Sequence, residues 1–127
     1  MRARTTRRLG DLELQILNVL WDRGPSSVRD VLEALPTPKP IYTTVLTLMR
    51  LMNEKGYLDR RERGRAHVYT ARLREQPTKR GLLRDLIQGA FRGSAEALLV
   101  RLLEDEKLSP EELDRVRQLI AQKETGG

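Results

Sequence analysis

The chain has 127 residues, of which 39% are hydrophobic and 33% charged, and its formal net charge is +6. This length allows one domain, or a small domain with an appendage. The chain has no cysteine and a single histidine, His67, which excludes a disulfide scaffold, a thiol nucleophile and a thiolate or histidine-cluster metal site, so we expect no metal and no cofactor.

The N-terminal stretch MRARTTRRLG is basic, but no apolar segment follows it. No run approaches the roughly 18 apolar residues of a membrane-spanning helix, so we expect a soluble, cytoplasmic protein without a membrane partner. The arginines of this stretch are compatible with a DNA-contacting arm and equally with a purely solubilising role; they are Arg2, Arg4, Arg7 and Arg8.

Two helices are predicted next. The first runs from Asp11 to about Arg23, and Gly24 and Pro25 end it. Its apolar stripe consists of Leu12, Ile16, Val19 and Leu20. The second helix is predicted to begin after Ser27, because Ser27 and Asp30 resemble a capping box, with aspartate in place of the usual glutamate or glutamine. The broad apolar stripe of the first helix is typical of a helix that packs in a core.

A third helix, which ends at Gly56, follows a proline-rich connector. The residues predicted to face the core recur four, three and four positions apart and are Ile41, Val45, Leu48 and Met52. The residues left on the outer face are Tyr42, Thr43, Thr44, Thr47 and Arg50. Threonine is a mediocre helix former, but its hydroxyl can bond to phosphate and its methyl can contact thymine. We interpret this face as DNA-reading; the alternative is that the threonines are only solvated.

After Gly56 the sequence favours two strands joined by a turn at Glu62-Arg63-Gly64. Leu58 and Val68 are predicted to point to the core, whereas Tyr69 is predicted to point away. Arginines recur along this hairpin, namely Arg60, Arg61, Arg63 and Arg65, and the last three are candidate DNA contacts. A threonine-bearing helix followed by a basic hairpin is typical of a winged helix-turn-helix, although a solvated charge run remains the alternative reading of the arginines.

Charge divides the chain in two. Residues 1–75 hold 15 Lys and Arg against 9 Asp and Glu, whereas residues 76–127 hold 9 of each. We therefore predict a winged helix-turn-helix DNA-binding domain over residues 1–75 and a helical dimerisation domain over residues 76–127. The expected fold class is mainly α with a small β-hairpin.

Three short helices are predicted in the C-terminal part. The first spans Thr78 to Phe91, and the last begins where Ser109, Pro110 and Glu112 supply an N-cap, a proline at N1 and a glutamate at N3. These helices are too short to close a core around their leucines, so we expect them to pack against a second copy of the chain. The residues expected at this dimer interface are Leu86, Leu98, Leu99, Leu102, Leu103, Leu113, Val116, Leu119 and Ile120.

Four segments together resemble the BlaI/MecI family of penicillinase repressors. They are LGDLE from Leu9 to Glu13, YTTVLTLMRLMNEKG from Tyr42 to Gly56, the wing, and EDEKLSPEEL from Glu104 to Leu113. The resemblance covers nearly the whole chain. It implies a homodimeric winged-helix repressor, without enzymatic activity, that binds an inverted-repeat double-stranded DNA operator with TACA/TGTA-like half-sites.

Two departures from the family pattern bear on function. Leu51 stands where members of the family often carry arginine. The better-known members are inactivated when a membrane-bound metalloprotease sensor cuts an Asn-Phe bond in the dimerisation segment, and the matching pair here is Arg101-Leu102. This bond is thus a candidate cleavage site and a sensor protease a candidate partner; a small ligand or a partner protein is equally compatible with derepression. A related copper-sensing branch uses C-terminal cysteines, which this chain lacks.

Two other function classes compete with the repressor. A winged helix can serve as a protein-interaction module without sequence-specific DNA binding, because a fold does not determine a function. An enzyme is disfavoured, since the chain has no cysteine, one histidine, no glycine loop that could cradle phosphate and no carboxylate pair with metal-ligand spacing, and no catalytic residue is assigned. The acidic neighbours Glu104, Asp105 and Glu106 are expected to end a helix on a solvated surface.

Overall fold

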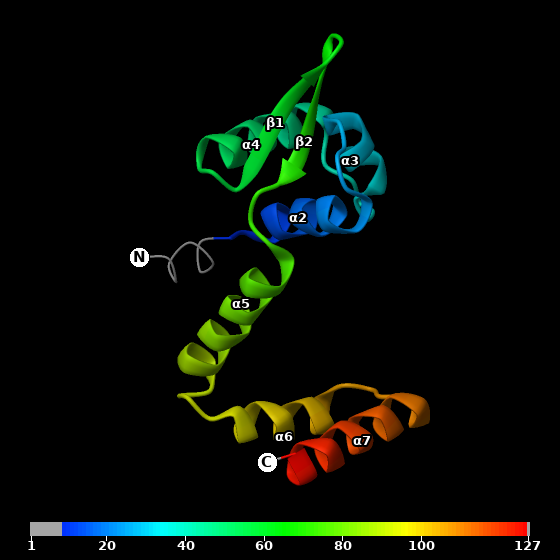
Figure 1. Cartoon of the computed structure of the whole chain (residues 1–127), viewed down its shortest axis with the longest axis vertical. Helices are drawn as coiled ribbons and strands as arrows, with labels where there is room; N and C mark the ends of the chain where they lie inside the picture. Colours follow the sequence, from blue (N-terminus) through cyan, green and yellow to red (C-terminus); the bar gives the residue numbers. More distant parts are fainter. Residues whose placement is uncertain (1–8, 127) are drawn as a thin grey trace. The chain divides into compact units, whose positions relative to one another are not determined.

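The computed structural model describes residues 9–126, which fall into two compact units that part between Asp85 and Leu86. The elements are α2 (Asp11–Arg23), α3 (Val28–Ala34), α4 (Tyr42–Glu54), β1 (Leu58–Arg63), β2 (Ala66–Ala71), α5 (Glu75–Ala90), α6 (Ala95–Asp105) and α7 (Pro110–Gly126) (Figure 1). The predicted fold class is confirmed: helices dominate, and the two strands form an antiparallel hairpin, the wing. The predicted domain boundary falls at the first residue of α5 and stays a prediction, and the N-terminal arginines lie outside the described residues.

Local capping chemistry explains where several helices begin and end. Ser27 and Asp30 form the predicted capping box, in which each backbone N–H donates to the other side chain at 3.1 Å. Gly56 follows α4 with a φ of 87°, the left-handed conformation that terminates helices at low cost for glycine. Ser109 and Glu112 form a second reciprocal box at 2.9 and 3.0 Å, which starts α7 at Pro110. These three boundaries confirm the sequence predictions.

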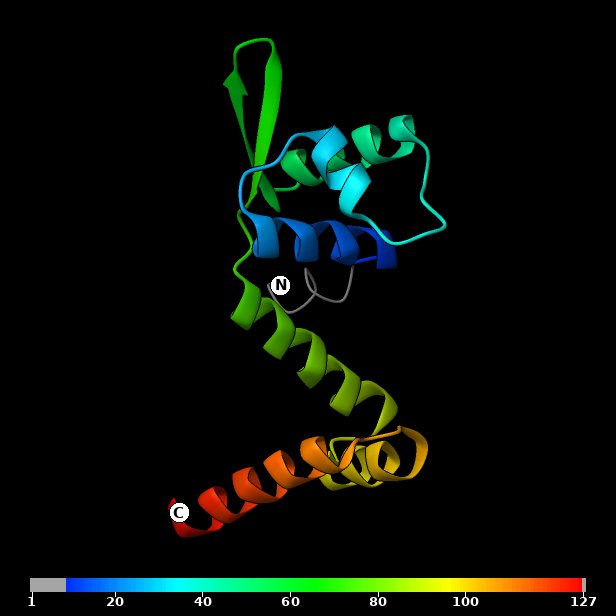
Figure 2. The same ribbon diagram turned by 90° about the vertical axis from the view of Figure 1, so that its right-hand side faces the viewer.

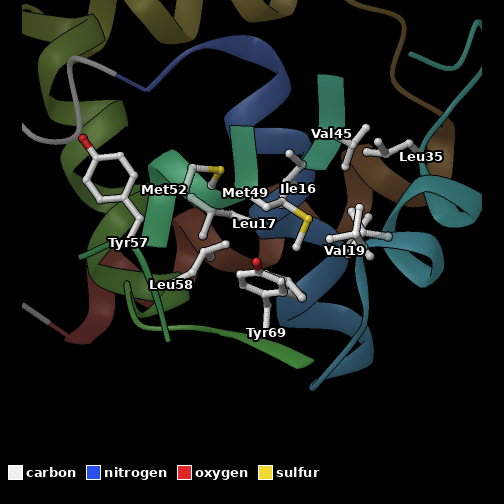
Figure 3. Packing of buried hydrophobic residues seen from close by; sticks show 13 residues of the cluster. Ile16, Leu17, Val19, Leu35, Val45, Met49, Met52, Tyr57, Leu58 and Tyr69 are labelled. Atoms are coloured by element: carbon white, nitrogen blue, oxygen red, sulfur yellow. The ribbon is translucent and has the colours of Figure 1, made fainter. Parts of the chain in front are cut away.

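The hydrophobic core lies in the first unit, where helices α2, α3 and α4 and the hairpin meet. Figure 3 shows core side chains converging from these elements, among them Ile16, Leu17, Val45, Met49, Met52, Leu58 and Tyr69. All seven are at most 1% exposed. The packed core holds α4 with one face inward, which leaves its opposite face free for contacts outside the chain.

The prediction that Ile41 faces the core is wrong. Ile41 is 69% exposed, because it is the N-cap of α4 and its backbone is extended, with φ −77° and ψ 158°. Helical periodicity does not apply to a residue outside the helix. The buried positions of α4 are instead Val45, Met49 and Met52, and Leu48 is half-buried.

The predicted turn and phase of the wing are also wrong. The turn consists of Gly64 and Arg65, so the register pairs Leu58 with Ala71 and Arg60 with Tyr69. A three-residue turn at 62–64 would have set Leu58 opposite Val68, whereas the two-residue turn moves every residue of β2 to the other face. Tyr69 is consequently 1% exposed and belongs to the core, while Val68 is half-buried.

Helix α5 begins three residues earlier than predicted. Its first turn contains Pro77, which a first turn tolerates because the backbone N–H groups there have no partner within the helix. Trp21 of α2 donates its Nε1–H to the carbonyl of Leu73 at 2.9 Å, and the Lys79 ammonium lies 5.6 Å from the Trp21 ring centroid. These contacts attach the start of α5 to the first unit.

Candidate nucleic-acid interface

Helix α4 presents the predicted reading face to solvent. Because Val45, Met49 and Met52 occupy the core, Thr43, Thr44, Thr47 and Arg50 lie exposed on the opposite face. Tyr42 precedes Met49 by seven residues and therefore lies on the core side of the first turn, where it is 39% exposed. The structure therefore brings four of the five predicted residues together on one exposed surface, and Tyr42 lies at the start of the helix beside Arg29 of α3. Their contacts with DNA stay a prediction.

A shallow hollow runs along this face. It has a volume of about 410 Å³ and is lined by Thr43, Thr44, Thr47, Leu48 and Leu51. The lining residues are uncharged, and each contributes at least one methyl group. Leu51 is 44% exposed, although the next residue in the sequence, Met52, is fully buried.

Arg29 also lies at the candidate interface, although its position in the sequence does not predict this. Its guanidinium carbon lies 5.2 Å from the centroid of the Tyr42 ring, a cation–π distance. Arg29 is on α3 and Tyr42 is in the first turn of α4, so this contact links the two helices of the helix-turn-helix at the surface. Sequence spacing alone gives no signal for a contact between helices.

Lys39 fixes the connector between the same two helices. Its ammonium donates to the carbonyl oxygens of Leu32 at 3.1 Å, Glu33 at 2.7 Å and Leu35. These carbonyls lie at the C-terminal end of α3, where helix carbonyls run short of backbone donors and where positive charge is favoured. Lys39 thereby positions the chain that leads into α4, and an exposed lysine in a connector offers no sequence signal for that role.

The wing is attached to the helices by backbone and side-chain hydrogen bonds. Ser26 and Tyr69 exchange two backbone hydrogen bonds of 3.0 and 2.8 Å, which adds a short third segment beside β2. Asn53 in α4 donates its Nδ2–H to the carbonyl of Leu58 at 2.8 Å. The base of the hairpin is therefore held in place, and in both views the hairpin tip extends beyond the helices of its unit (Figure 2).

The candidate DNA contacts of the wing lie along its exposed part. Alternation in β1 puts Arg61 and Arg63 on one face, where they line a depression of about 610 Å³, and Arg65 lies in the turn. In the part of the chain that the structure describes, none of these three arginines forms an ion pair, whereas the neighbouring Asp59 pairs with Arg72 at 3.7 Å. Their charges are available to an external anion.

The residues predicted at the dimer interface are on α5, α6 and α7. Seven are exposed by 36 to 63% of their surface, and these are Leu86, Leu99, Leu102, Leu103, Val116, Leu119 and Ile120. Leu98 and Leu113 are half-buried. Neither α6 nor α7 contains a buried residue, so their apolar faces are only partly covered within the described unit. Large exposed apolar faces mark interaction surfaces.

The candidate cleavage bond lies inside α6. Arg101 forms an ion pair with Asp105 one turn later at 3.4 Å, and Leu102 is 42% exposed. The bond separates Leu98 and Leu99 from Leu102 and Leu103 on the same helix. A cut there would divide the apolar face of α6 into two pieces.

Two kinds of feature are absent from residues 9–126: a cluster of metal-ligating side chains and a membrane-crossing helix. No group of three His, Asp or Glu side chains in that range could hold a metal ion. No helix in that range is long and apolar enough to cross a membrane.

Comparisons with known proteins give a consistent result. A family model described as penicillinase repressor matches residues 9–122. The transcriptional regulator BlaI of Mycobacterium tuberculosis is 35% identical over 94% of this chain and 87% of its own length. The methicillin resistance regulatory protein MecI of Staphylococcus aureus is 23% identical over 93% and 97%, and the penicillinase repressor of Bacillus licheniformis is 25% identical over 89% of each.

Among solved structures, a match was found with BpsR of Bordetella bronchiseptica, whose DNA binding is described as regulated by 6-hydroxynicotinic acid. The TM-score is 0.47 at 19% identity, over 93% of this chain and 76% of that one.

Proposed function

The chain belongs to the penicillinase repressor family, and from this premise we propose that it is a sequence-specific DNA-binding repressor that acts as a homodimer on an inverted-repeat operator. The relatives are transcriptional regulators and repressors, which is a non-enzymatic class. One observation carries the proposal: four of the five predicted reading residues share the exposed face of α4, and the neighbouring wing has three arginines that form no ion pair within residues 9–126. A cytoplasmic location is part of the same proposal.

The chemistry of the α4 face suits a major groove. In the proposed complex the hydroxyl of Tyr42, in the first turn, contacts the sugar-phosphate edge, and Arg50 contacts a phosphate. Between them Thr44 and Thr47 can present hydroxyl and methyl groups to base edges. Arg29, stacked on Tyr42, adds a positive charge at the same end of the surface. Thr43 completes the face.

The wing supplies charge that does not depend on base sequence. Arg61, Arg63 and Arg65 can lie along phosphates or enter a narrow minor groove. The affinity should then fall steeply with salt, with a slope of about −0.9 in log units for each phosphate neutralised.

The exposed apolar faces of α6 and α7, with Leu86 on α5, are proposed to pack against the same surface of a second copy. This pairing would set the distance between the two recognition helices and hence the spacing of the half-sites. Cleavage at Arg101-Leu102 by a sensor protease would divide that surface and release the dimer. Because the bond lies inside α6, the helix must unwind locally before a protease can act. A small ligand or a partner protein would relieve repression without this step.

The test is selection of bound duplexes from a random DNA library at near-physiological salt. A two-fold symmetric motif with fixed spacing supports the proposal. Thr44→Ala should then cost on the order of 1–3 kcal/mol on the selected site and little on random DNA. Arg63→Ala, as the matched control, should weaken both equally. Recovery of unenriched sequence with strongly salt-dependent binding would instead favour a protein-interaction module with a basic surface.

A further inference from the structure

The hollow on α4 includes an apolar side chain, that of Leu51, which has no role in the contacts with phosphates and base edges proposed above. Leu51 follows Thr47 by one turn and Thr44 by two turns, so the three side chains share one face of the helix. The hollow that they line, with Thr43 and Leu48, is open to solvent and has a volume of about 410 Å³. The side chain of Leu51, which helps to line the hollow, is 44% exposed.

The surroundings of this hollow specify the kind of partner that fits it. The hollow itself is uncharged, whereas Arg50 lies beside it on α4 and the residues up to 75 carry the whole net charge of the chain. A duplex has the complementary arrangement, with phosphates at the rims of the major groove and the 5-methyl group of thymine inside it. Thymine is the only unmodified DNA base that presents an apolar group there.

On the premise that α4 enters the major groove, which is part of the proposed function, we infer that Leu51 is a specificity-determining residue that contacts the 5-methyl group of a thymine. The methyl groups of Thr44 and Thr47 form the rest of this contact. The site distinguishes thymine from cytosine by the presence of the methyl group, because a leucine side chain has no hydrogen-bonding group with which to distinguish them.

The experiment uses the full chain and the duplex recovered by the library selection. Each thymine is replaced in turn by deoxyuridine, which lacks only the 5-methyl group. Burial of one methyl-sized group corresponds to about a fourfold change in affinity. We expect a loss of that size at one position in each half-site and little change at the others.

Two variants assign the effect to a residue. Leu51→Ala should lose most of the preference for the thymine over the deoxyuridine duplex at the sensitive position, and the methyl groups of Thr44 and Thr47 account for any remainder. Leu83→Ala changes a leucine of similar exposure, 49%, on α5 and should keep the wild-type preference. The wild-type measurement stands even if one variant folds poorly.

The outcomes separate this inference from the proposed function. If no symmetric motif is selected, the proposed function fails. If a motif is selected but no deoxyuridine substitution weakens binding, the proposed function stands and the inference is overturned. If Leu51→Ala retains the full deoxyuridine effect, the methyl group is contacted by other residues and the assignment to Leu51 is wrong.

Discussion

Residues 9–85 and residues 86–126 contain similar apolar side chains but place them in different surroundings. In the first unit, Leu17, Met49 and Met52 are fully buried. In the second, Leu99, Leu103 and Leu119 are 57, 61 and 63% exposed, and neither α6 nor α7 has a buried residue. The first unit thus closes its own core, whereas the second has helical faces that require a partner to be buried.

This difference is what the proposed function requires, since that function assigns DNA reading to the first unit and dimerisation to the second. A closed core holds α4 rigidly enough to present a defined outer face, as a specific DNA reader requires. Helices without a core of their own gain stability only on association, which makes them suited to assembly and to its control. Variants in the first unit should therefore change the free energy of unfolding, whereas variants in the second should change the dissociation constant of the proposed dimer.

The largest expected effect is on the core. Met49→Ala should lower the free energy of unfolding by about 2–5 kcal/mol, because it removes buried methylene groups and leaves a cavity in the core cluster that also contains Leu17 and Tyr69. Chemical denaturation measures this loss, and it should be the same at low and high protein concentration. A loss that vanished at high concentration would show that the first unit depends on association.

The next effect is on association. Leu103→Ala should weaken the proposed dimer by on the order of 2 kcal/mol, about thirtyfold in dissociation constant, if its exposed side chain is buried by the partner. Sedimentation equilibrium measures the change. Glu104→Ala, which changes the adjacent exposed residue of α6, is the control and should change the constant little. Equal effects from the two variants would count against an apolar interface here.

A smaller effect is expected at the helix-turn-helix connector. Lys39→Met keeps most of the side-chain length but removes the donor to the carbonyls of Leu32, Glu33 and Leu35, so it should cost about 1 kcal/mol of stability. It should also weaken binding to the selected site more than to random DNA, because the entry to α4 is less well fixed. Lys107→Met, outside the first unit, should leave both quantities unchanged.

The smallest effect concerns pH. Hydrogen bonding by the backbone N–H and then the hydroxyl of Ser27 lowers the pKa of Asp30 below its ordinary value. Since the folded state favours the charged carboxylate, its contribution to stability is present above the ordinary pKa of about 4 and is lost as the pH falls through the lower folded value. The stability difference between wild type and Asp30→Asn, followed by thermal unfolding, should be constant near neutral pH and shrink below pH 4. A difference independent of pH would contradict this account.

Much of the fold could be predicted because its signals are local. The capping boxes at Ser27 and Ser109 and the stop at Gly56 depend on residues within a few positions of one another, and the structure has all three. The outer face of α4 could be predicted for a related reason, since helical periodicity identifies the face opposite Val45 and Met52.

The predictions that were wrong or missing depend on backbone geometry and contacts that sequence periodicity does not specify. Ile41 fits the apolar period of α4 but lies before the helix, where the extended backbone cancels that period. The turn between the strands is one residue shorter than predicted, so the side chains of β2 point to the opposite faces. As a result Tyr69 lies in the core and Val68 does not. The roles of Lys39 and Arg29 could not be predicted, because both depend on how separate elements are placed in space.

The most direct test of the proposed division into a DNA-binding unit and a dimerisation unit is the mass of the full chain in solution. Sedimentation velocity measures this mass over a wide concentration range. The account predicts a reversible species of twice the 14.6 kDa chain mass, which dissociates more readily in Leu103→Ala and binds the selected operator as one dimer per duplex. A chain that stays at 14.6 kDa at every concentration and binds the operator as independent monomers would contradict it.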